Sequence, residues 1–457
     1  MAELISNIYF LILWISFAFS VQLIYLFYRE NERPAVRKMT LISALLFAYI
    51  LIAMLVFPGV LIIIDLSALI LILIYLTWPF SVKKDLTDNI PALRYDERDI
   101  MFSRKELSPG SMQYDQYYRK NPKREILDLN FRKEPGLLSE KSLYYHPAAF
   151  KIAENYFKKI DQLIPFITGL PSKNITELNI FERTQNIKQI ATSLGALNVG
   201  ITKCKDYHFY SHKGRGTSYG KQIYPSDKFA IAFTVEMDHK MVAAAPKASI
   251  LMESSKQYYN AAKIAIGIAE QIRNWGFEAK AHIDGNYELI CPLVARDAGL
   301  GELGRMGILM TPTHGPRVRI AVVTTTLELI PDNYIKNHTV LDFCRICKKC
   351  ADCCPSNAIS FSEPETLEGT KRWKINSEAC YTYWCKAGTD CGRCMAVCPY
   401  SHPNNVAHKL TRWAIRHSSP FRKIAVILDD FFYGKKPTPK KIPQINDSDL
   451  KDSIPKL

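Results

Sequence analysis

The chain has 457 residues, of which 48% are hydrophobic, and a formal charge of +15 from 59 Lys and Arg against 44 Asp and Glu. This charge indicates an anionic partner: membrane lipid, nucleic acid or an acidic protein. Most of the hydrophobic excess precedes residue 80, and ten of the 12 cysteines lie between Cys344 and Cys398. Such clustering excludes a chain-wide disulfide framework and favours a cysteine-ligated metal centre.

Three apolar segments at the N-terminal end predict membrane-spanning helices, at residues 4–28, 39–57 and 60–78. Each approaches or exceeds the roughly 20 residues that cross a bilayer as a helix. The first is too long for the apolar part of a signal peptide, and no Lys or Arg precedes it. Pro58-Gly59 predicts a tight hairpin between the second and third. Residues 1–84 are therefore expected to form a three-helix transmembrane anchor.

Flanking charges predict the orientation of this anchor. By the positive-inside rule, the N-terminus lies outside and the chain after residue 84 faces the cytoplasm, as a multi-pass protein of the cytoplasmic membrane. A reducing cytosol also keeps thiols free to bind metal. The positive residues that set the orientation are Arg29, Arg33, Arg37, Lys38, Lys83 and Lys84.

Asp65 lies about one turn inside the third apolar segment. Two interpretations are open for it: a carboxylate that reaches the interface from near a helix end, or a proton or quinone role. Outside residues 1–84, 53 Lys and Arg face 40 Asp and Glu. An anionic membrane surface accounts for this surplus, and no nucleic-acid-binding motif is present, so we expect no nucleic-acid partner.

The remaining chain divides into four regions. Residues 85–145 are polar, without sustained periodicity, and are expected to form an extended linker that wraps onto the catalytic body. Residues 146–335 alternate helical signals (148–160, 254–275) with strand signals (229–236, 318–327), which predicts a mixed α/β or α+β core. A cysteine-rich domain follows at 336–402. Residues 403–457 are expected to form an amphipathic helix (406–432) and a flexible Lys- and Pro-rich tail.

The cysteine spacing is that of a ferredoxin-type domain with two [4Fe-4S] clusters. Cys344, Cys347, Cys350 and Cys354-Pro355 follow the bacterial C-x₂-C-x₂-C-x₃-C-P pattern, whose fourth cysteine ligates the other cluster. A partial second copy ends at Cys398-Pro399. Crossed ligation predicts one cluster held by Cys344, Cys347, Cys350 and Cys398, and another held by Cys354, Cys380, Cys391 and Cys394.

Other cysteine assignments are weighed against this prediction. Cys385 is an alternative to Cys380 as the eighth ligand, and Cys353 is interpreted as a bystander beside Cys354. Structural zinc prefers two C-x₂-C pairs and does not explain the run. Cys204 and Cys291 are distant in sequence and are expected to pack as small hydrophobic residues.

The region ahead of the clusters resembles the reductive dehalogenases, corrinoid and iron–sulfur enzymes that remove halide from organohalides. The likeness spans roughly residues 125–405. It is carried by an ordered series of short motifs: RKEPGLL at 132–138, EMD at 236–238, Ala245-Pro246, Tyr258, residues 261–281, 298–307 and 315–325, CYTYW at 380–384 and CPY at 398–400.

This resemblance implies a nitroreductase-like α/β core that binds a corrinoid next to one cluster. It also implies that Tyr258 donates a proton, with Tyr259 as an alternative, and that either Arg317 or Arg319 assists. A cation beside a phenol stabilises its phenolate and so makes it a more useful acid. The sequence assigns no residue to corrinoid binding. Asp206-x-His208 approaches a corrinoid-ligand motif, but Ser211 replaces its glycine, so His208 is interpreted as a surface or pocket histidine.

Taken together, these features predict a membrane-anchored, cytoplasm-facing oxidoreductase of the reductive dehalogenase type. Electrons from a ferredoxin or the quinol pool would reach a small organic substrate, an organohalide or another acceptor, through two clusters and a corrinoid. The chain contains no Arg-Arg pair, which departs from exported members with a twin-arginine signal. Two alternatives remain: a membrane-bound dicluster electron carrier without corrinoid, and an epoxyqueuosine-reductase-like enzyme.

Overall fold

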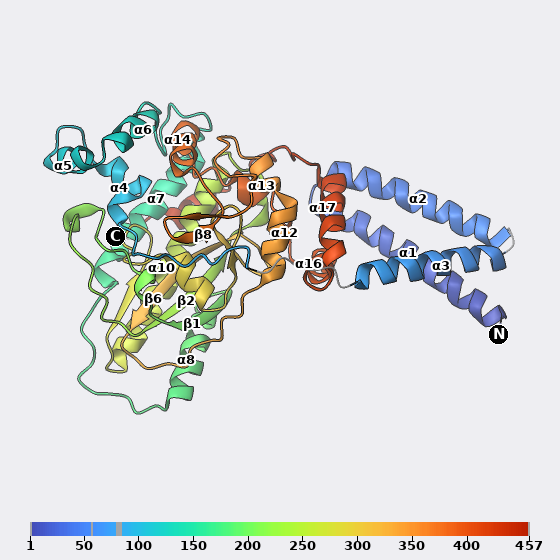
Figure 1. Ribbon diagram of the computed structural model, residues 1–457, viewed down its shortest axis with the longest axis horizontal. Helices are drawn as coiled ribbons and strands as arrows, with labels where there is room; N and C mark the ends of the chain where they lie inside the picture. Colours follow the sequence, from blue (N-terminus) through green and yellow to red (C-terminus); the bar gives the residue numbers. More distant parts are fainter. Residues whose placement is uncertain (1, 56–57, 79–84, 456–457) are drawn as a thin grey trace. The chain divides into compact units, whose positions relative to one another are not determined.

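The computed structural model describes residues 2–55, 58–78 and 85–455 (Figure 1). The chain forms two compact units, one from residues 1–82 and 404–437 and the other from 83–403 and 438–457. Lys83 and Lys84, used above for orientation, and the end of the second apolar segment at residues 56–57 lie outside the described residues.

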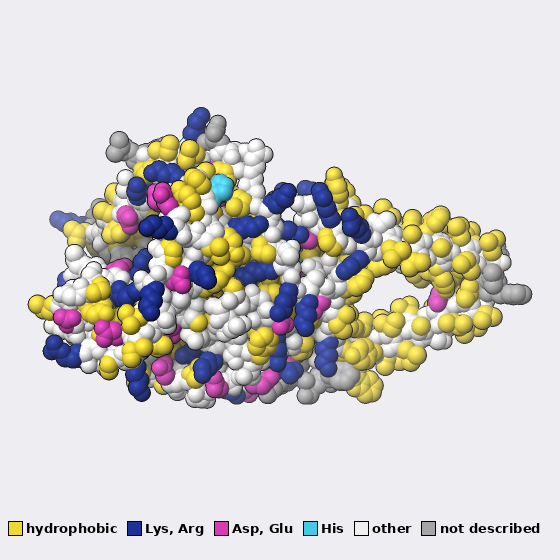
Figure 2. All heavy atoms as spheres, turned by 90° about the horizontal axis from the view of Figure 1, so that it is seen from above, with side chains coloured by type: hydrophobic (Ala, Val, Ile, Leu, Met, Phe, Trp, Pro, Cys, Tyr) yellow, Lys and Arg dark blue, Asp and Glu magenta, His cyan; other side chains and the backbone are white. Residues whose placement is uncertain are grey.

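Three long helices make up most of the first unit: α1 (Ala2–Arg29), α2 (Arg33–Leu55) and α3 (Pro58–Thr77). Each is long and apolar enough to cross a membrane, as the sequence predicts. Figure 2 shows their side chains as almost wholly hydrophobic. The second helix begins at Arg33, before the expected start at residue 39, because the basic stretch ahead of the apolar segment is also helical. Helices α16 (Val406–His417) and α17 (Ser419–Tyr433) complete the unit.

Asp65 joins the three long helices through hydrogen bonds. Its Oδ2 accepts from Tyr9 Oη of α1 at 2.7 Å and from Tyr49 Oη of α2 at 2.6 Å. The two phenol oxygens are themselves 3.1 Å apart. The carboxylate therefore faces the interior of the bundle, which corrects the interpretation of a side chain that reaches out to the interface. Polar side chains that bond across helices are a common means of holding membrane helices together.

An antiparallel four-stranded sheet with the order β1-β2-β6-β3 forms the centre of the second unit. Its strands are β1 (Asn198–Lys203), β2 (Phe229–Glu236), β3 (Ala279–His282) and β6 (Val318–Thr325). In the register of the central pair, Ile231 stands opposite Val323. Seven of the eight β2 residues are buried, because helices cover both faces of the sheet.

The two faces of β2 contact different helices. Ile231 and Phe233 belong to a core that includes residues of α7 (Pro147–Leu163), α8 (Ile180–Ser193) and α10 (Ser249–Asn274). The alternate residues Ala230 and Ala232 belong to a second core with α11 (Cys291–Asp297). This period-two division is the pattern of a strand buried on both sides. It confirms the expected mixture of helices and strands and specifies an antiparallel sheet.

The segment expected to be an extended linker includes several short helices. It contains α4 (Met101–Glu106), α5 (Met112–Lys120) and α6 (Pro122–Arg132). Arg104 of α4 is fully buried, and its Nη2 lies 3.4 Å from Asp128 Oδ1 and 2.9 Å from Glu378 Oε1. The segment does wrap onto the body, as expected, but these ion pairs attach short helices that the charge-rich sequence did not reveal.

The expected flexible tail is also partly ordered. It ends in α18 (Asp447–Ser453), where Asn155 Nδ2 of α7 donates to Ser453 Oγ at 3.1 Å. Upstream, Lys440 N donates to Ala243 O at 3.1 Å. Ile442 and Ile445 pack against the core beside α7. These two isoleucines, which lie among prolines and lysines, attach the tail to that core. The expected C-terminal helix is two helices, α16 and α17.

The remaining elements connect the sheet to the cysteine-rich domain and flank it. They are η1 (Glu97–Asp99), η2 (Ile164–Phe166), η3 (Asp206–His208), η4 (Gly216–Ser218), α9 (His239–Ala243), β4 (Glu302–Leu303), β5 (Leu309–Met310), α12 (His338–Cys347), α13 (Lys349–Asp352), β7 (Glu365–Leu367), β8 (Thr370–Arg372), α14 (Ser377–Ala387), α15 (Arg393–Ala396) and η5 (Pro399–Ser401).

Replacing Asp65 tests the polar junction of the anchor. We expect Asp65→Leu to lower the free energy of unfolding in detergent by about 1–2 kcal/mol, because two phenols lose their interhelical acceptor. Tyr9→Phe combined with Tyr49→Phe should cost a similar amount, and all three changes together should cost less than the sum. Thr77→Val is the control, since Thr77 Oγ1 bonds within its own helix. Additive losses would contradict a shared network.

Candidate iron–sulfur centres and active site

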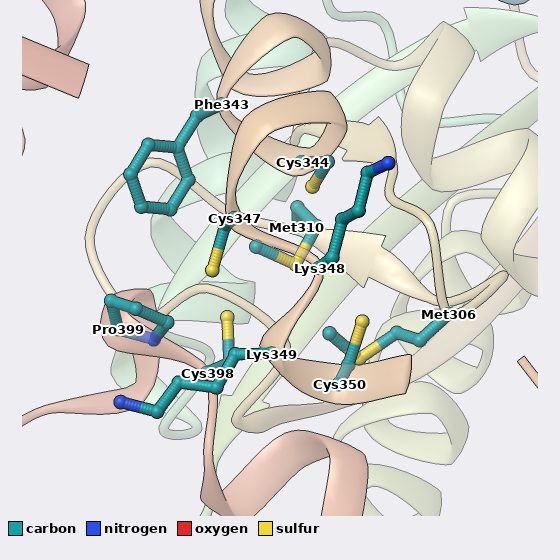
Figure 3. Close-up of a pocket in the computed structure, with 10 residues that line it drawn as sticks. All are labelled: Met306, Met310, Phe343, Cys344, Cys347, Lys348, Lys349, Cys350, Cys398 and Pro399. Atoms are coloured by element: carbon teal, nitrogen blue, oxygen red, sulfur yellow. The ribbon is translucent and has the colours of Figure 1, made fainter. Parts of the chain in front are cut away.

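The first predicted cluster site is a cavity that four cysteines line. Cys344 and Cys347 come from α12, Cys350 comes from α13, and Cys398 arrives from the far end of the domain. Figure 3 shows their sulfurs around one space. Its volume is about 280 Å³, including the part that is open to solvent. Lys348 between the two helices has a φ of 55°, and this left-handed turn lets both helices present thiols to the same cavity.

Electrostatics agree with this grouping. Burial raises the pKa of the Cys398 thiol well above its usual range, and the neighbouring Cys344, Cys347 and Cys350 raise it further. No group of three or more Cys, His, Asp or Glu in the described part of the chain converges as the ligands of one ion would. A four-iron cluster separates its thiolates more widely, one at each iron, so a lined cavity is the arrangement that fits it.

The second predicted set is also brought together. Burial raises the pKa of Cys394 to about 12, and its neighbours Cys380 and Cys354 contribute to the shift. Burial likewise raises the pKa of Cys391, whose neighbours include Cys394 and Cys380. Cys394 is also a neighbour of Cys350 in the first set, so the two sets are adjacent.

The other cysteines lie elsewhere. Cys385 packs with Tyr381 and Met101 in a separate hydrophobic cluster. Cys353 contacts Arg393, one residue before Cys394 in the chain. Cys291, the first residue of α11, and Cys204 pack in the hydrophobic core on that side of the sheet, as expected for small hydrophobic residues. The geometry thus groups Cys380, and not Cys385, with the second set.

Tyr258 of α10 lies under a guanidinium group. The Arg319 Cζ is 4.8 Å from the centre of the Tyr258 ring, and Arg319 reaches it from β6. Arg319 Nη2 also donates to Ser254 Oγ and, at 2.7 Å, to Asp390 Oδ2. Asp390 directly precedes Cys391 in the chain. Tyrosine, arginine and the second cysteine loop are therefore linked by contacts.

Burial sets the protonation state of this tyrosine. It raises the pKa of Tyr258 to about 12, although Arg319 partly opposes the shift. The phenol consequently keeps its proton at neutral pH. Tyr258, Asp284 and Tyr287 are set deep within the protein yet remain partly accessible to solvent. Asp284 and Tyr258 both raise the pKa of Tyr287, so the three groups lie near one another.

Arg317, the other candidate beside Tyr258, is occupied elsewhere. Its side chain is 1% exposed and donates to Glu236 Oε1 at 2.8 Å, to Met237 O and to Ser401 O at 3.0 Å. These bonds join the end of β2 to the chain just after Cys398. The structure therefore brings Arg319, and not Arg317, to Tyr258. Arg317 instead connects β2 to the chain after Cys398.

Tyr259, the alternative to Tyr258, lies against different partners. Its ring is 5.7 Å from that of Tyr156, and Lys263 lies over it at 4.8 Å. His208 is fully buried, which corrects its interpretation as a surface or pocket residue. Its Nε2 is 2.9 Å from Asp297 Oδ2, and its Nδ1 accepts from Lys205 N at 3.2 Å. Both ring nitrogens are thus engaged within the protein.

Sequence reasoning missed four residues of this region: Ser254, Asp284, Tyr287 and Asp390. Two of them had a signal. Ser254 precedes Tyr258 by four residues, which puts both on one face of a helix. Asp390 adjoins a predicted cluster ligand. Nothing local marks Asp284 or Tyr287, which reach the site from the segment after β3.

The polar groups around Tyr258 fit a further polar cofactor such as a corrinoid. Among the described residues, Arg319 Nε and Asp390 Oδ1 are buried without a hydrogen-bond partner. Buried polar atoms ordinarily have partners, so these two have capacity left for another group.

Comparisons with known proteins agree with this arrangement. The profile of the 4Fe-4S dicluster domain family matches residues 343–402. A tetrachloroethene reductive dehalogenase of Desulfitobacterium hafniense is 39% identical over 198 residues, covering 41% of this chain and 35% of the relative. Another of the same description from Sulfurospirillum multivorans is 32% identical over 211 residues, covering 44% and 41%. The chain thus matches well under half the length of these relatives.

Solved structures extend the likeness to the fold. A reductive dehalogenase whose structure is described with a mechanism for B12-dependent dehalogenation superposes with a TM-score of 0.61 at 23% identity, covering 80% of this chain and 53% of that one. A catabolic reductive dehalogenase in complex with 3-bromo-4-hydroxybenzoic acid gives 0.61 at 24% identity, covering 78% and 48%. In fold, and in having a dicluster domain, this chain is similar to the reductive dehalogenases.

Proposed function

We propose that the chain is a membrane-anchored reductase of the reductive dehalogenase type, with two [4Fe-4S] clusters, a corrinoid and Tyr258 as proton donor. The observation that carries this proposal is the linkage of Tyr258, Arg319 and Asp390 to the loop of Cys391. A protonated phenol and a cation that are linked to a predicted ligand loop support this role. The proposed substrate is an organohalide, as in the names of the relatives.

Eight cysteines hold the clusters in this proposal. Each thiolate binds one iron, so each four-iron cluster needs four cysteines. In the crossed arrangement, three of them come from one motif and the fourth from elsewhere. The crossing explains why Cys398 lines the same cavity as Cys344. The two sets are Cys344, Cys347, Cys350 and Cys398, and Cys354, Cys380, Cys391 and Cys394.

Tyr258 supplies the proton from its Oη. With a pKa of about 12, the phenol stays protonated across the physiological pH range. Transfer of its proton leaves a phenolate. Arg319 lies over the ring and stabilises that negative charge. Asp390 and Ser254 hold the guanidinium group in place through their hydrogen bonds. Tyr258 thus acts as the general acid, with Arg319 as its electrostatic partner.

A corrinoid, when bound, supplies the low-potential cobalt chemistry that cleaves a carbon–halogen bond. We propose that it is held in a nitroreductase-like core, beside Tyr258, Asp284 and Tyr287. The two unpartnered atoms, Arg319 Nε and Asp390 Oδ1, are available to bind its polar substituents or the substrate. The depth of these residues within the protein limits the access of bulk water to the reacting centre.

Orientation and electron supply complete the proposal. The basic residues at the end of α1 and in the first turns of α2 favour a catalytic unit on the cytoplasmic side. A ferredoxin or the quinol pool then serves as electron donor, because both are reached from that side.

Exchanging single cysteines tests the second cluster. We expect Cys380→Ser to lower the iron content and change the electron paramagnetic resonance spectrum of the reduced protein, because a thiolate ligand is lost. Cys385→Ser is the matched control and should retain the full iron content. Normal iron in Cys380→Ser together with loss in Cys385→Ser would reverse the assignment.

Removing one hydroxyl tests the proton donor. Tyr258→Phe should lower the rate of halide release by about 10²–10⁴-fold, the usual contribution of general acid catalysis, while both cluster signals persist. Tyr259→Phe provides the control, with a rate near that of the unchanged protein. Undiminished halide release from Tyr258→Phe would remove this tyrosine from the mechanism.

A further inference from the structure

Helices α16 and α17 have one face buried against their own unit. His408, Arg412 and Ile415 form the buried face of α16, and Arg422 and Ala425 belong to that of α17. Arg422 Nε donates to Ile415 O at 3.0 Å, which joins the two helices.

The opposite faces expose large apolar side chains. On α16 these residues are Val406, Leu410 and Trp413, spaced four and three residues apart, with exposed fractions of 58%, 51% and 61%. On α17 the exposed residues are Ile427, Leu428 and Phe431. Helical spacing gathers each set into one stripe. An exposed stripe that contains Trp and Phe on two joined helices indicates a binding surface.

These helices pack at one end of the three-helix bundle. Glu30, just after α1, accepts from Asn405 Nδ2 at 2.6 Å and from Tyr433 Oη at 2.9 Å. Phe27 of α1 lies 5.1 Å from Phe432, centre to centre. Ser418 Oγ, between α16 and α17, donates to Leu76 O of α3 at 2.6 Å.

The same end of the bundle carries aromatic residues typical of a membrane–water interface. Tyr25 and Tyr28 lie in the last turns of α1 and are 58% and 73% exposed, and Trp78, just after α3, is 58% exposed. Exposed Tyr and Trp at the ends of apolar helices mark the level of the lipid headgroups. Because α16 and α17 are bonded to these helix ends, they lie at that level too.

Charge favours a particular kind of lipid. Residues 404–437 contain seven Lys and Arg and two Asp, both of the latter on α17. Lys409 and Arg416 are exposed beside the apolar stripe of α16, and Lys423 is exposed beside that of α17. An apolar stripe bordered by basic side chains is the pattern of a helix that lies in the interface of an anionic membrane.

We infer that α16 and α17 form an anionic-phospholipid-binding surface. The apolar stripes enter the boundary between headgroups and acyl chains, and Lys409, Arg416 and Lys423 bind lipid phosphates. A protein partner on the same face is the competing possibility, but the continuity with the membrane-level aromatic residues favours lipid. This surface is independent of the chemistry proposed at Tyr258.

Fluorescence of Trp413 tests the lipid contact. The full chain is placed in nanodiscs of phosphatidylcholine with phosphatidylglycerol, and the Trp413 emission is obtained as the difference between the protein and Trp413→Phe. We expect bromine-labelled lipid to quench this emission by about half, since an interfacial side chain sits within reach of the upper acyl chain. Quenching by aqueous iodide without quenching by the lipid would overturn the lipid surface.

A charge variant tests the preference for anionic lipid. Lys409→Gln, Arg416→Gln and Lys423→Gln combined should lower the retained phosphatidylglycerol several-fold relative to phosphatidylcholine, as measured by mass spectrometry of lipid copurified from mixed bilayers. The matched control neutralises three exposed lysines of the second unit, Lys173, Lys203 and Lys221, and should retain lipid normally. Unchanged cluster absorbance verifies folding of both variants. Equal lipid retention by the two variants would overturn the anionic preference.

Discussion

The ion pair between Arg319 and Asp390 is the contact on which the proposed active site depends. Arg319 comes from a central strand, while Asp390 belongs to the loop that carries Cys391. A buried charge is tolerated when it is paired and hydrogen-bonded, so this pair constrains where the strand and the loop can lie. Tyr258 lies against the same guanidinium group, and its distance from the cysteine loop is thereby restricted. Arg317 makes a second connection, from β6 to the chain after Cys398.

The sheet makes this arrangement rigid. β2 and β6 are paired along their full length and covered by helices on both faces, so side chains that project from β6 have little freedom. Long α10 crosses one face and presents Ser254 and Tyr258 from successive turns.

The first unit is held together differently, because its long helices have few polar side chains. There Asp65 and its two tyrosines supply polar contacts inside the bundle, and Glu30 joins the helix ends to α16 and α17.

Features encoded by local spacing could be predicted from the sequence, and those created by distant contacts could not. The apolar helices and the crossed cysteine sets follow from short patterns. The choice of Arg319 over Arg317 could not be predicted from such a pattern. Both residues flank Val318, and only their packing in the folded chain distinguishes them. The short helices of residues 97–132 depend on pairs such as Arg104 with Glu378, 274 residues apart. His208 is buried with its Nε2 against Asp297 Oδ2, a partner 89 residues away that no motif around the histidine indicates.

The most direct test of this account is the metal content of the purified full chain, produced with cobalamin available. Two clusters require about eight iron atoms, and a corrinoid bound beside Tyr258 requires one cobalt per chain. We predict both metals together, with Arg319→Gln lowering cobalt while the iron is retained. Full iron without cobalt would contradict the central claim, and the chain would then be a membrane-bound dicluster electron carrier.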